Sequence, residues 1–286
     1  MKVIFYFFVA QQEKRILSTE FDELVCRLVS ARLNGSLAAV ASLKQIKDVQ
    51  TAYLIQDEVY KKLGTCPSFW KVGSTSKQAQ RKLGTTEPGA ARVPSQFCFV
   101  SGDIVPIFAT HDVWVEGEFA FRLGRDLLPR KQPYTFEEVT DAIDGIAPSI
   151  EIVGSRLETG ISGSGRLNIT ADGGANVALC IGQIVANTKT YDLPNHEVNL
   201  YVNDTKVSRG YGARALDNPI HVMVWIANHQ RKTTGLKAGE VVATGTCTGL
   251  NKVGPGDNIR ADFGCIGNVT VGLTDHDENL ISNQEK

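Results

Sequence analysis

Apolar and polar side chains alternate along the segment 113–123, VWVEGEFAFRL. A period of two residues predicts a β-strand, because successive side chains of a strand point to opposite faces of the sheet. Val115, Phe119 and Phe121 would face one side, and Glu116 and Glu118 would face the other. We therefore expect two carboxylates close together on one face of a central strand.

Two like charges held together need a cation between them, or one carboxylate must take up a proton. Ligation by oxygen alone favours a hard ion such as Mg²⁺ or Mn²⁺ over zinc. The plainer alternative is an amphipathic strand whose polar face contacts water, as in many antiparallel sheets. The alternation alone favours this plain interpretation, so the rest of the chain must decide.

The same patterns predict the other elements. Apolar stripes with caps predict helices over 19–33, 48–63, 75–83, 135–144 and 218–232. Apolar runs predict strands over 69–73, 147–153, 178–185, 240–246, 258–263 and 268–273, with a hairpin over 198–207. Segments rich in glycine or proline predict loops over 87–94, 160–165 and 172–175. We expect an α+β fold with an N-terminal helical region, 1–66, and a β-rich catalytic domain, 67–286.

Two charged residues lie inside apolar strands. Lys71 stands between Trp70 and Val72, where a lysine usually extends its ammonium to solvent, and a desolvated amine used in acid–base work is the alternative. Glu151 stands between two isoleucines, so it must be paired, protonated or bound to a metal if it is buried. A salt bridge to Arg156 and metal ligation are both open for this carboxylate.

Composition narrows the possible functions. The 286 residues carry a net charge of −1, which argues against a nucleic-acid-binding protein. The six cysteines have neither zinc-like spacing nor a CxxC pair and indicate reduced thiols in a cytoplasmic protein. We find no apolar run long enough to cross a membrane, and the apolar start, 3–10, favours a leading strand or tail over a signal peptide. The glycine-rich segments lack a nucleotide-binding context.

Five motifs occur in a familiar order: FWKVGSTSKQAQRKLG, VEGEFAFRLGRDL, APSIEIVGSR, VATGTCTG and VGPGDNIRADFGCIGNVTV. In this order they resemble the fumarylacetoacetate hydrolase superfamily, and within it the branch of 2-hydroxypentadienoate (2-keto-4-pentenoate) hydratases and 4-oxalocrotonate decarboxylases. The resemblance covers about 66–273. It implies a mixed β-roll core with an N-terminal helical region, and a homo-oligomer, in some members with a decarboxylase partner.

The resemblance also implies roles for particular residues. Glu116, Glu118 and Glu151 would hold Mg²⁺ or Mn²⁺, and Lys71 matches the active-site lysine of the family. A substrate pocket would be lined by Val72, Gly73, Asp172, Thr244 and Thr246. The chain departs from the family pattern at 172–175, DGGA, where the family often has DNxS, so a hydroxyl and an amide are missing. Asp103 is only a weak match to an aspartate of the hydratases.

The reaction that follows from the resemblance is the hydration of a 2-hydroxy-2,4-dienoate to a 4-hydroxy-2-oxo acid, as in meta-cleavage catabolism of aromatic compounds. The enzyme would be a metal-dependent hydro-lyase with a small 2-oxo or 2-hydroxy acid as substrate. Three alternatives stay open: a 4-oxalocrotonate-type decarboxylase, an acylpyruvate C–C hydrolase, and a catalytically silent member of the family. The hydrolase would need a base such as histidine, and only His111 precedes the central strand closely.

Overall fold

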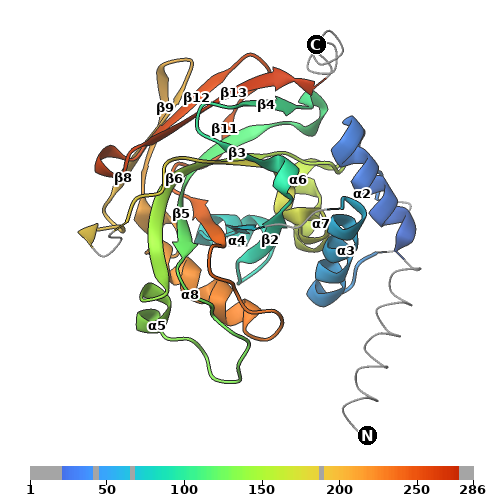
Figure 1. The fold of residues 1–286 in the computed structure, drawn as a ribbon. Helices are drawn as coiled ribbons and strands as arrows, with labels where there is room; N and C mark the ends of the chain where they lie inside the picture. The colour runs from blue at the N-terminus through green and yellow to red at the C-terminus, as the bar shows by residue number, and fades with distance from the viewer. Residues whose placement is uncertain (1–20, 41–44, 65–67, 187–189, 277–286) are drawn as a thin grey trace, which may run out of the picture.

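The computed structural model describes residues 21–40, 45–64, 68–186 and 190–276, and the expected leading segment 3–10 lies outside them. Two curled β-sheets lie against each other, and two helices near the N-terminus pack beside the larger sheet (Figure 1). The predicted α+β fold with a mixed β-roll and an N-terminal helical region is confirmed. The division of the chain into two domains at residue 66 stays a prediction.

The larger sheet has the strand order β2-β1-β10-β5-β6-β7-β3, and β11 pairs with β5. It is a mixed sheet, since β1 and β10 run parallel, as do β3 and β7, while the central pairs are antiparallel. Its strands are β1 (Phe69–Gly73), β2 (Gly89–Val93), β3 (Cys98–Val100), β5 (Trp114–Leu123), β6 (Ile143–Val153), β7 (Asn176–Ile181), β10 (Val241–Thr246) and β11 (Asn251–Lys252).

The smaller sheet has the order β4-β13-β12-β8-β9. The predicted hairpin is present between β8 and β9, with its turn at Asn203 and Asp204, whose positive φ values suit the twist of a two-residue hairpin. Its strands are β4 (Ile104–Ile107), β8 (Glu197–Val202), β9 (Thr205–Tyr211), β12 (Asn258–Asp262) and β13 (Asn268–Asp275).

The described residues form seven α-helices, most of which lie beside the larger sheet (Figure 1). The side chain of Asp48 caps α3, and Asn218 caps α8 with Pro219 at its first position, as the sequence predicts. The predicted cap Thr19 lies outside the described residues. The helices are α2 (Asp22–Asn34), α3 (Val49–Lys62), α4 (Lys77–Leu83), α5 (Phe136–Thr140), α6 (Gly160–Gly163), α7 (Gly165–Ala171) and α8 (Pro219–Gln230).

The main core lies between the two sheets. Val115, Phe119 and Phe121 of β5 are buried there, on the face that the alternation predicts as apolar. Gly117 lies on the same face, where an added Cβ would come within 3.2 Å of Val198 on β8. The apolar face of β5 is therefore held against the smaller sheet, and the carboxylates of β5 point away from it.

Three expectations about local structure are wrong. The segment 87–94 is not all loop, because β2 pairs with β1 and buries Ala90, Ala91 and Val93. The segment 160–165 forms α6 and the start of α7 rather than a loop. The helix expected over 135–144 ends at Thr140, although its capping box is present, because Ile143 already begins β6. In each case tertiary pairing or packing outweighs the local composition.

Candidate metal centre

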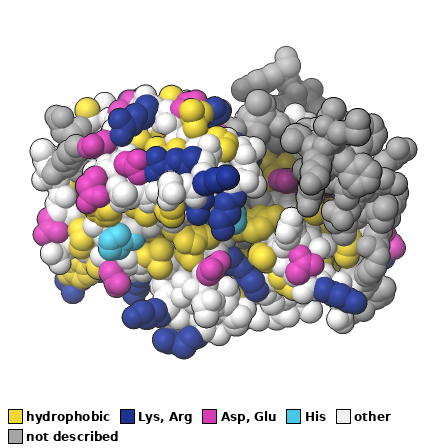
Figure 2. All heavy atoms as spheres, turned by 90° about the horizontal axis from the view of Figure 1, so that it is seen from below, with side chains coloured by type: hydrophobic (Ala, Val, Ile, Leu, Met, Phe, Trp, Pro, Cys, Tyr) yellow, Lys and Arg dark blue, Asp and Glu magenta, His cyan; other side chains and the backbone are white. Residues whose placement is uncertain are grey.

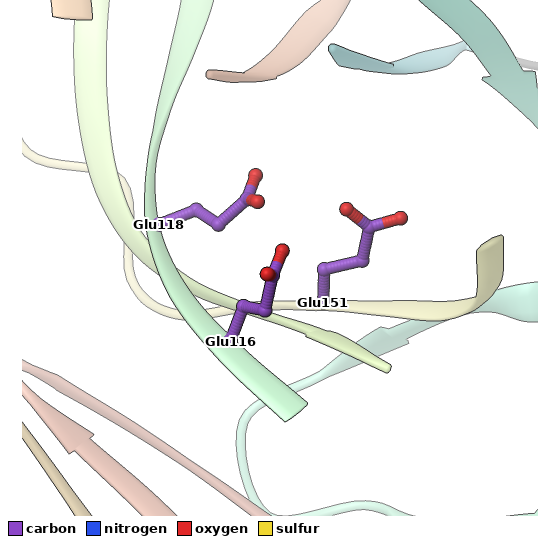
Figure 3. Close-up of side chains that lie close together, drawn as sticks. All are labelled: Glu116, Glu118 and Glu151. Atoms are coloured by element: carbon purple, nitrogen blue, oxygen red, sulfur yellow. The ribbon is translucent and has the colours of Figure 1, made fainter. Parts of the chain in front are cut away.

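Three glutamates meet on one face of the larger sheet. Glu116 and Glu118 of β5 and Glu151 of β6 offer carboxylate oxygens that all lie within 4.8 Å of one another. The register explains this meeting, because Glu116 and Glu151 are directly opposed in the antiparallel ladder and Glu118 is two residues further along. In Figure 3 the three side chains turn their carboxylates toward a common space.

The cluster is withdrawn from water. The side chains of Glu118 and Glu151 are each 1% exposed, and Glu116 is half-buried, so the interpretation of a simply wetted polar face is wrong for this part of β5. Burial and the neighbouring charge of Glu151 raise the pKa of Glu116 to about 7. The same causes, with Glu116 added, raise the pKa of Glu118 well above its usual value.

The arrangement fits a cation. Glu118 accepts a hydrogen bond at Oε2 from the backbone N–H of Gly245 at 3.0 Å, but its buried Oε1 has no hydrogen-bond partner among the described residues. A buried acceptor without a partner is costly, and three carboxylates this close repel one another. A hard divalent cation would satisfy both the free oxygen and the excess charge.

Lys71 lies beside the cluster and does not reach solvent. Its side chain is 4% exposed, and its Nζ lies 3.2 Å from Oε1 of Glu151. It also donates a hydrogen bond of 2.6 Å to the backbone carbonyl of Gly174. The expectation that this lysine extends into water is therefore wrong, because β1 turns Lys71 toward β6 and away from the surface.

Glu151 is oriented by an amide as well. Asn176, at the start of β7, donates from Nδ2 to Oε1 of Glu151 at 2.9 Å, the same oxygen that faces Lys71. The alternative of a salt bridge between Glu151 and Arg156 is wrong, because the guanidinium of Arg156 donates to Asp172 at 2.6 Å. The side-chain bonds of Glu151 with other described residues thus gather on Oε1 and leave Oε2 for another partner.

A pocket opens in front of the carboxylates. It has a volume of about 160 Å³ and is lined at one end by Lys71, Glu116 and Glu151. Apolar side chains line much of its wall, among them Leu83, Ile161, Ile169 and Leu250. A wider hollow of about 620 Å³, lined by Thr246 and Trp114, shares Glu116 and Leu250 with it. A small organic molecule could therefore reach the carboxylates from the surface.

The other residues expected to line the pocket are divided. Gly73 borders the pocket and Thr246 borders the wider hollow. Val72 is fully buried in the main core, and Thr244 donates its hydroxyl to the carbonyl of Phe119. Asp172 is 3% exposed and pairs with Arg156. These last three side chains serve the packing and bonding of the fold around the pocket.

Sequence reasoning missed Asn176 and Gly174. An amide does reach the site, but it comes one residue after the DGGA segment that we compared with the family pattern. Gly174 has φ +68, and a Cβ there would lie 2.9 Å from Nζ of Lys71, so only glycine brings its carbonyl this close without displacing the lysine. The consecutive residues Gly173 and Gly174 were the feature of the sequence that could have indicated this close approach of the backbone.

Known proteins resemble this chain over most of its length. The sequence profile described as fumarylacetoacetate (FAA) hydrolase C-terminal matches residues 72–274. A 2-keto-4-pentenoate hydratase from Paraburkholderia xenovorans (strain LB400) is 30% identical over 214 residues, 74% of this chain and 78% of that protein. The 2-keto-4-pentenoate hydratase 1 of Dechloromonas aromatica (strain RCB) is 28% identical over 260 residues, 90% of this chain and 97% of that protein.

Solved structures show the same fold. The 4-oxalocrotonate decarboxylase from Pseudomonas putida G7, complexed with magnesium and adipate, superposes with a TM-score of 0.77 at 23% identity. The superposition covers 88% of this chain and 98% of that one. The same enzyme is also known complexed with calcium and acetate. Among the described residues of our chain, no helix is long and apolar enough to cross a membrane.

Proposed function

The chain belongs to the fumarylacetoacetate hydrolase family, and from that membership we propose that it is a metal-dependent hydratase, a hydro-lyase. It adds water to a 2-hydroxy-2,4-dienoate, through the 2-oxo-enoate tautomer, and gives a 4-hydroxy-2-oxo acid. The relatives named 2-keto-4-pentenoate hydratase support this reaction. The observation that carries the proposal is the contact of Lys71 with Glu151 at the edge of a three-carboxylate cluster that borders a small pocket.

Glu116, Glu118 and Glu151 would hold the cation, for which Mg²⁺ or Mn²⁺ is the proposed identity. When bound, the ion supplies a Lewis acid for the carboxylate and the C2 oxygen of a 2-oxo acid. The protein groups then fix where the acid lies. Oε1 of Glu151 is already engaged by Lys71 and Asn176, so Oε2 is the oxygen that this residue would turn to the ion.

Lys71 would move the protons. Ketonisation moves the proton of the C2 hydroxyl to C5, and hydration then bonds the oxygen of a water molecule to C4 while one proton of that water goes to C3. The ammonium of Lys71 borders the pocket and is held between a carboxylate and a carbonyl, so its position is defined before the substrate arrives. A proton donor placed within reach of the reacting carbons contributes a factor of about 10² to 10⁴ to the rate.

The apolar wall of the pocket keeps bulk water away from the reacting carbons. Leu83, Ile161 and Leu250 line the space in front of Lys71, where the unsaturated carbons of the substrate would lie. Apolar side chains offer no hydrogen bonds to solvent, so a reactive enol there is protected from unguided protonation. The wall also strengthens the electrostatic effect of the nearby charges.

The C–C hydrolase is the weaker alternative. It needs a base to activate water, and among the described residues no histidine lines this pocket. His111, which precedes the central strand, is buried and borders a different cavity with Arg32. A decarboxylase uses the same ion and the same enol chemistry, and it differs from a hydratase by the carboxylate that its substrate loses.

Assembly and location belong to the proposal as well. We propose a homo-oligomer, with a decarboxylase partner as a further option, in the cytoplasm. The substrate is a small 2-oxo or 2-hydroxy acid. Acidic and basic side chains both occur on the face shown in Figure 2, and the net charge of the chain is −1.

The test is an ultraviolet assay with freshly made 2-hydroxypenta-2,4-dienoate, with Mg²⁺ or Mn²⁺ and with a chelator. We expect loss of the dienol absorbance that depends on the metal, together with formation of 4-hydroxy-2-oxopentanoate. Loss of absorbance without the hydrated product would reduce the activity to tautomerisation. Carbon dioxide released from 4-oxalocrotonate, with no hydration of the dienoate, would identify the decarboxylase instead.

A further inference from the structure

Arg166 of α7 is a cation in the pocket without a carboxylate partner. The residue is half-buried and lines the pocket that holds Lys71 and the glutamates. Its Nη1 donates to the hydroxyl of Ser74 at 3.1 Å, and its Nη2 donates to the carbonyl of Pro88 at 2.6 Å. It forms no salt bridge with any carboxylate of the described residues. A partly desolvated guanidinium with neutral partners alone attracts an anion.

The position of Arg166 relative to the carboxylates follows from the ladder between β1 and β2. Gly73 and Gly89 are directly opposed in this ladder. A Cβ on Gly73 would lie 3.2 Å from Nζ of Lys71, and a Cβ on Gly89 would collide with the guanidinium of Arg166. Opposed residues are roughly 5 Å apart, so both cations lie near this rung of the ladder, and both line the pocket. Lys71 is next to Glu151.

The lining of the pocket carries a further basic side chain. Lys82 of α4 lines both the pocket and the wider hollow, and it has no salt bridge within the described part of the chain. Glu87 is the nearby acidic residue, but it is exposed and lies beyond salt-bridge distance of Arg166. Burial lowers the pKa of Arg166, yet an arginine stays charged at neutral pH.

We propose that Arg166 binds a second carboxylate on the substrate chain, so that the enzyme prefers dicarboxylic over monocarboxylic 2-oxo acids. This inference rests on the proposed function, because it assumes that the 2-oxo acid group lies at Glu116, Glu118 and Glu151. The carbon chain then crosses the apolar wall past Lys71, and the terminal carboxylate meets the guanidinium. Glycine at position 89 leaves room for that guanidinium against the strand.

The test compares two acids that share the head group and the length of the chain. 2-Oxoadipate ends in a carboxylate and 2-oxohexanoate ends in a methyl group, and their binding to the Mg²⁺-loaded protein is measured by titration calorimetry. We expect the protein to bind 2-oxoadipate at least about 10-fold more tightly, as for one charge-assisted hydrogen-bonded pair. The preference should shrink as salt is added, because salt screens the partly exposed pair.

Variants separate binding from folding. Arg166→Met should abolish the preference while the affinity for 2-oxohexanoate stays within about 3-fold, and Arg166→Lys should keep part of it. Arg81→Met removes an exposed cation of α4 that does not line the pocket and should keep the full preference. Melting temperatures report whether each variant is folded.

The failures are distinguishable. Equal binding of the two acids by the unmodified protein, or a preference that survives in Arg166→Met, would overturn the assignment of Arg166 and leave the proposed function standing. Binding of neither acid would remove the 2-oxo acid site itself, and the assignment of Arg166 would fall with it.

Discussion

The ammonium of Lys71 lies 3.2 Å from Oε1 of Glu151, although 80 positions of the sequence separate the two residues. Both side chains are almost completely buried. A buried ion pair of this kind is not a general source of stability, because desolvation offsets most of the attraction. Its value here is positional: the pair fixes a proton donor at the edge of the carboxylate cluster.

Replacement of this lysine should separate proton transfer from metal binding. We expect Lys71→Met to lower kcat by about 10² to 10⁴-fold, because the proton donor is lost. Removal of a positive charge next to Glu151 should leave Mg²⁺ binding equal or tighter. Steady-state kinetics and Mg²⁺ titrations check both results, and kcat within 3-fold of the unmodified protein would refute the role of Lys71.

The carboxylates should control metal-dependent activity. Glu118→Gln removes a charge and a ligand, so we expect metal-dependent activity to vanish while the fold persists. The metal-free variant should melt at a higher temperature than the unmodified metal-free protein, because repulsion with Glu116 and Glu151 is relieved. Glu137→Gln, an exposed glutamate of α5, is the matched control and should change neither property. Full activity of Glu118→Gln would contradict the metal-site assignment.

The unfolding free energy of the metal-free protein should depend on pH because of the carboxylate cluster. A raised pKa means that the folded protein holds its proton more strongly than the unfolded chain, so the contribution of Glu116 is present below pH 4.5 and is lost as the pH rises toward about 7. We expect the metal-free protein to lose on the order of 1 to 3 kcal/mol over this range from the cluster.

A second group acts in the opposite direction. Burial lowers the pKa of His111 to about 4, and a buried neutral histidine gains stability as the pH rises from 4 to 6.5. The measurement is therefore the difference in unfolding free energy between Mg²⁺-loaded and metal-free protein at each pH, in which His111 cancels. This difference should grow from pH 4.5 to 7, and a flat difference would argue against a cation among the glutamates.

The carbonyl of Gly174 holds Lys71 from the other side. Gly174→Ala places a methyl group against the lysine and should lower kcat by at least about 10-fold. Gly64→Ala is the matched control, since Gly64 also has φ +68 but faces open space. Both variants should lose about 1 to 2 kcal/mol of stability from the left-handed backbone, and only Gly174→Ala should lose activity. Equal activity of the two variants would contradict the positioning role.

Asp172 should prove important for folding rather than for substrate binding. Asp172→Asn weakens a buried ion pair and leaves the guanidinium of Arg156 uncompensated, so we expect a loss of about 3 kcal/mol in unfolding free energy. KM measured on the folded enzyme should change by less than about 3-fold. Asp144→Asn breaks an exposed pair with Arg122 and should cost less than about 1 kcal/mol. Unfolding in urea and substrate titrations give both quantities.

The part of the site that could be predicted from the sequence follows from the two-residue alternation of side chains along a strand. The alternation places Glu116 and Glu118 on one face, and that needs no knowledge of the remaining chain. For Glu151 the sequence leaves two alternatives open, a salt bridge to Arg156 and metal ligation. The choice depends on the direction in which the loop after β6 turns the side chain of Arg156. The structure decides this through Asp172, which takes the guanidinium.

The unpredicted part depends on contacts between distant loops. The position of Lys71 in its strand does not by itself decide between solvent and a buried site, because the sequence does not show that the 172–176 segment closes over β1. The strand β2 was missed because Gly89 suggests a loop, whereas here its lack of a side chain admits Arg166. Small residues at a close approach look like breakers in a single sequence, and only the fold shows what they make room for.

The pocket has two walls of different character. Strands contribute Lys71, Glu116 and Glu151 to its lining, whereas α4, α6 and α7 contribute much of the remaining lining, including Arg166. Substitutions in the buried, paired strands would disturb the sheet. Substitutions in the short helices joined at glycines can change the pocket without breaking the pairing of the strands. Among gene copies that diverge from a common ancestor, new substrate preferences would therefore arise in 77–83 and 160–171, while the inherited chemistry of the sheet is conserved.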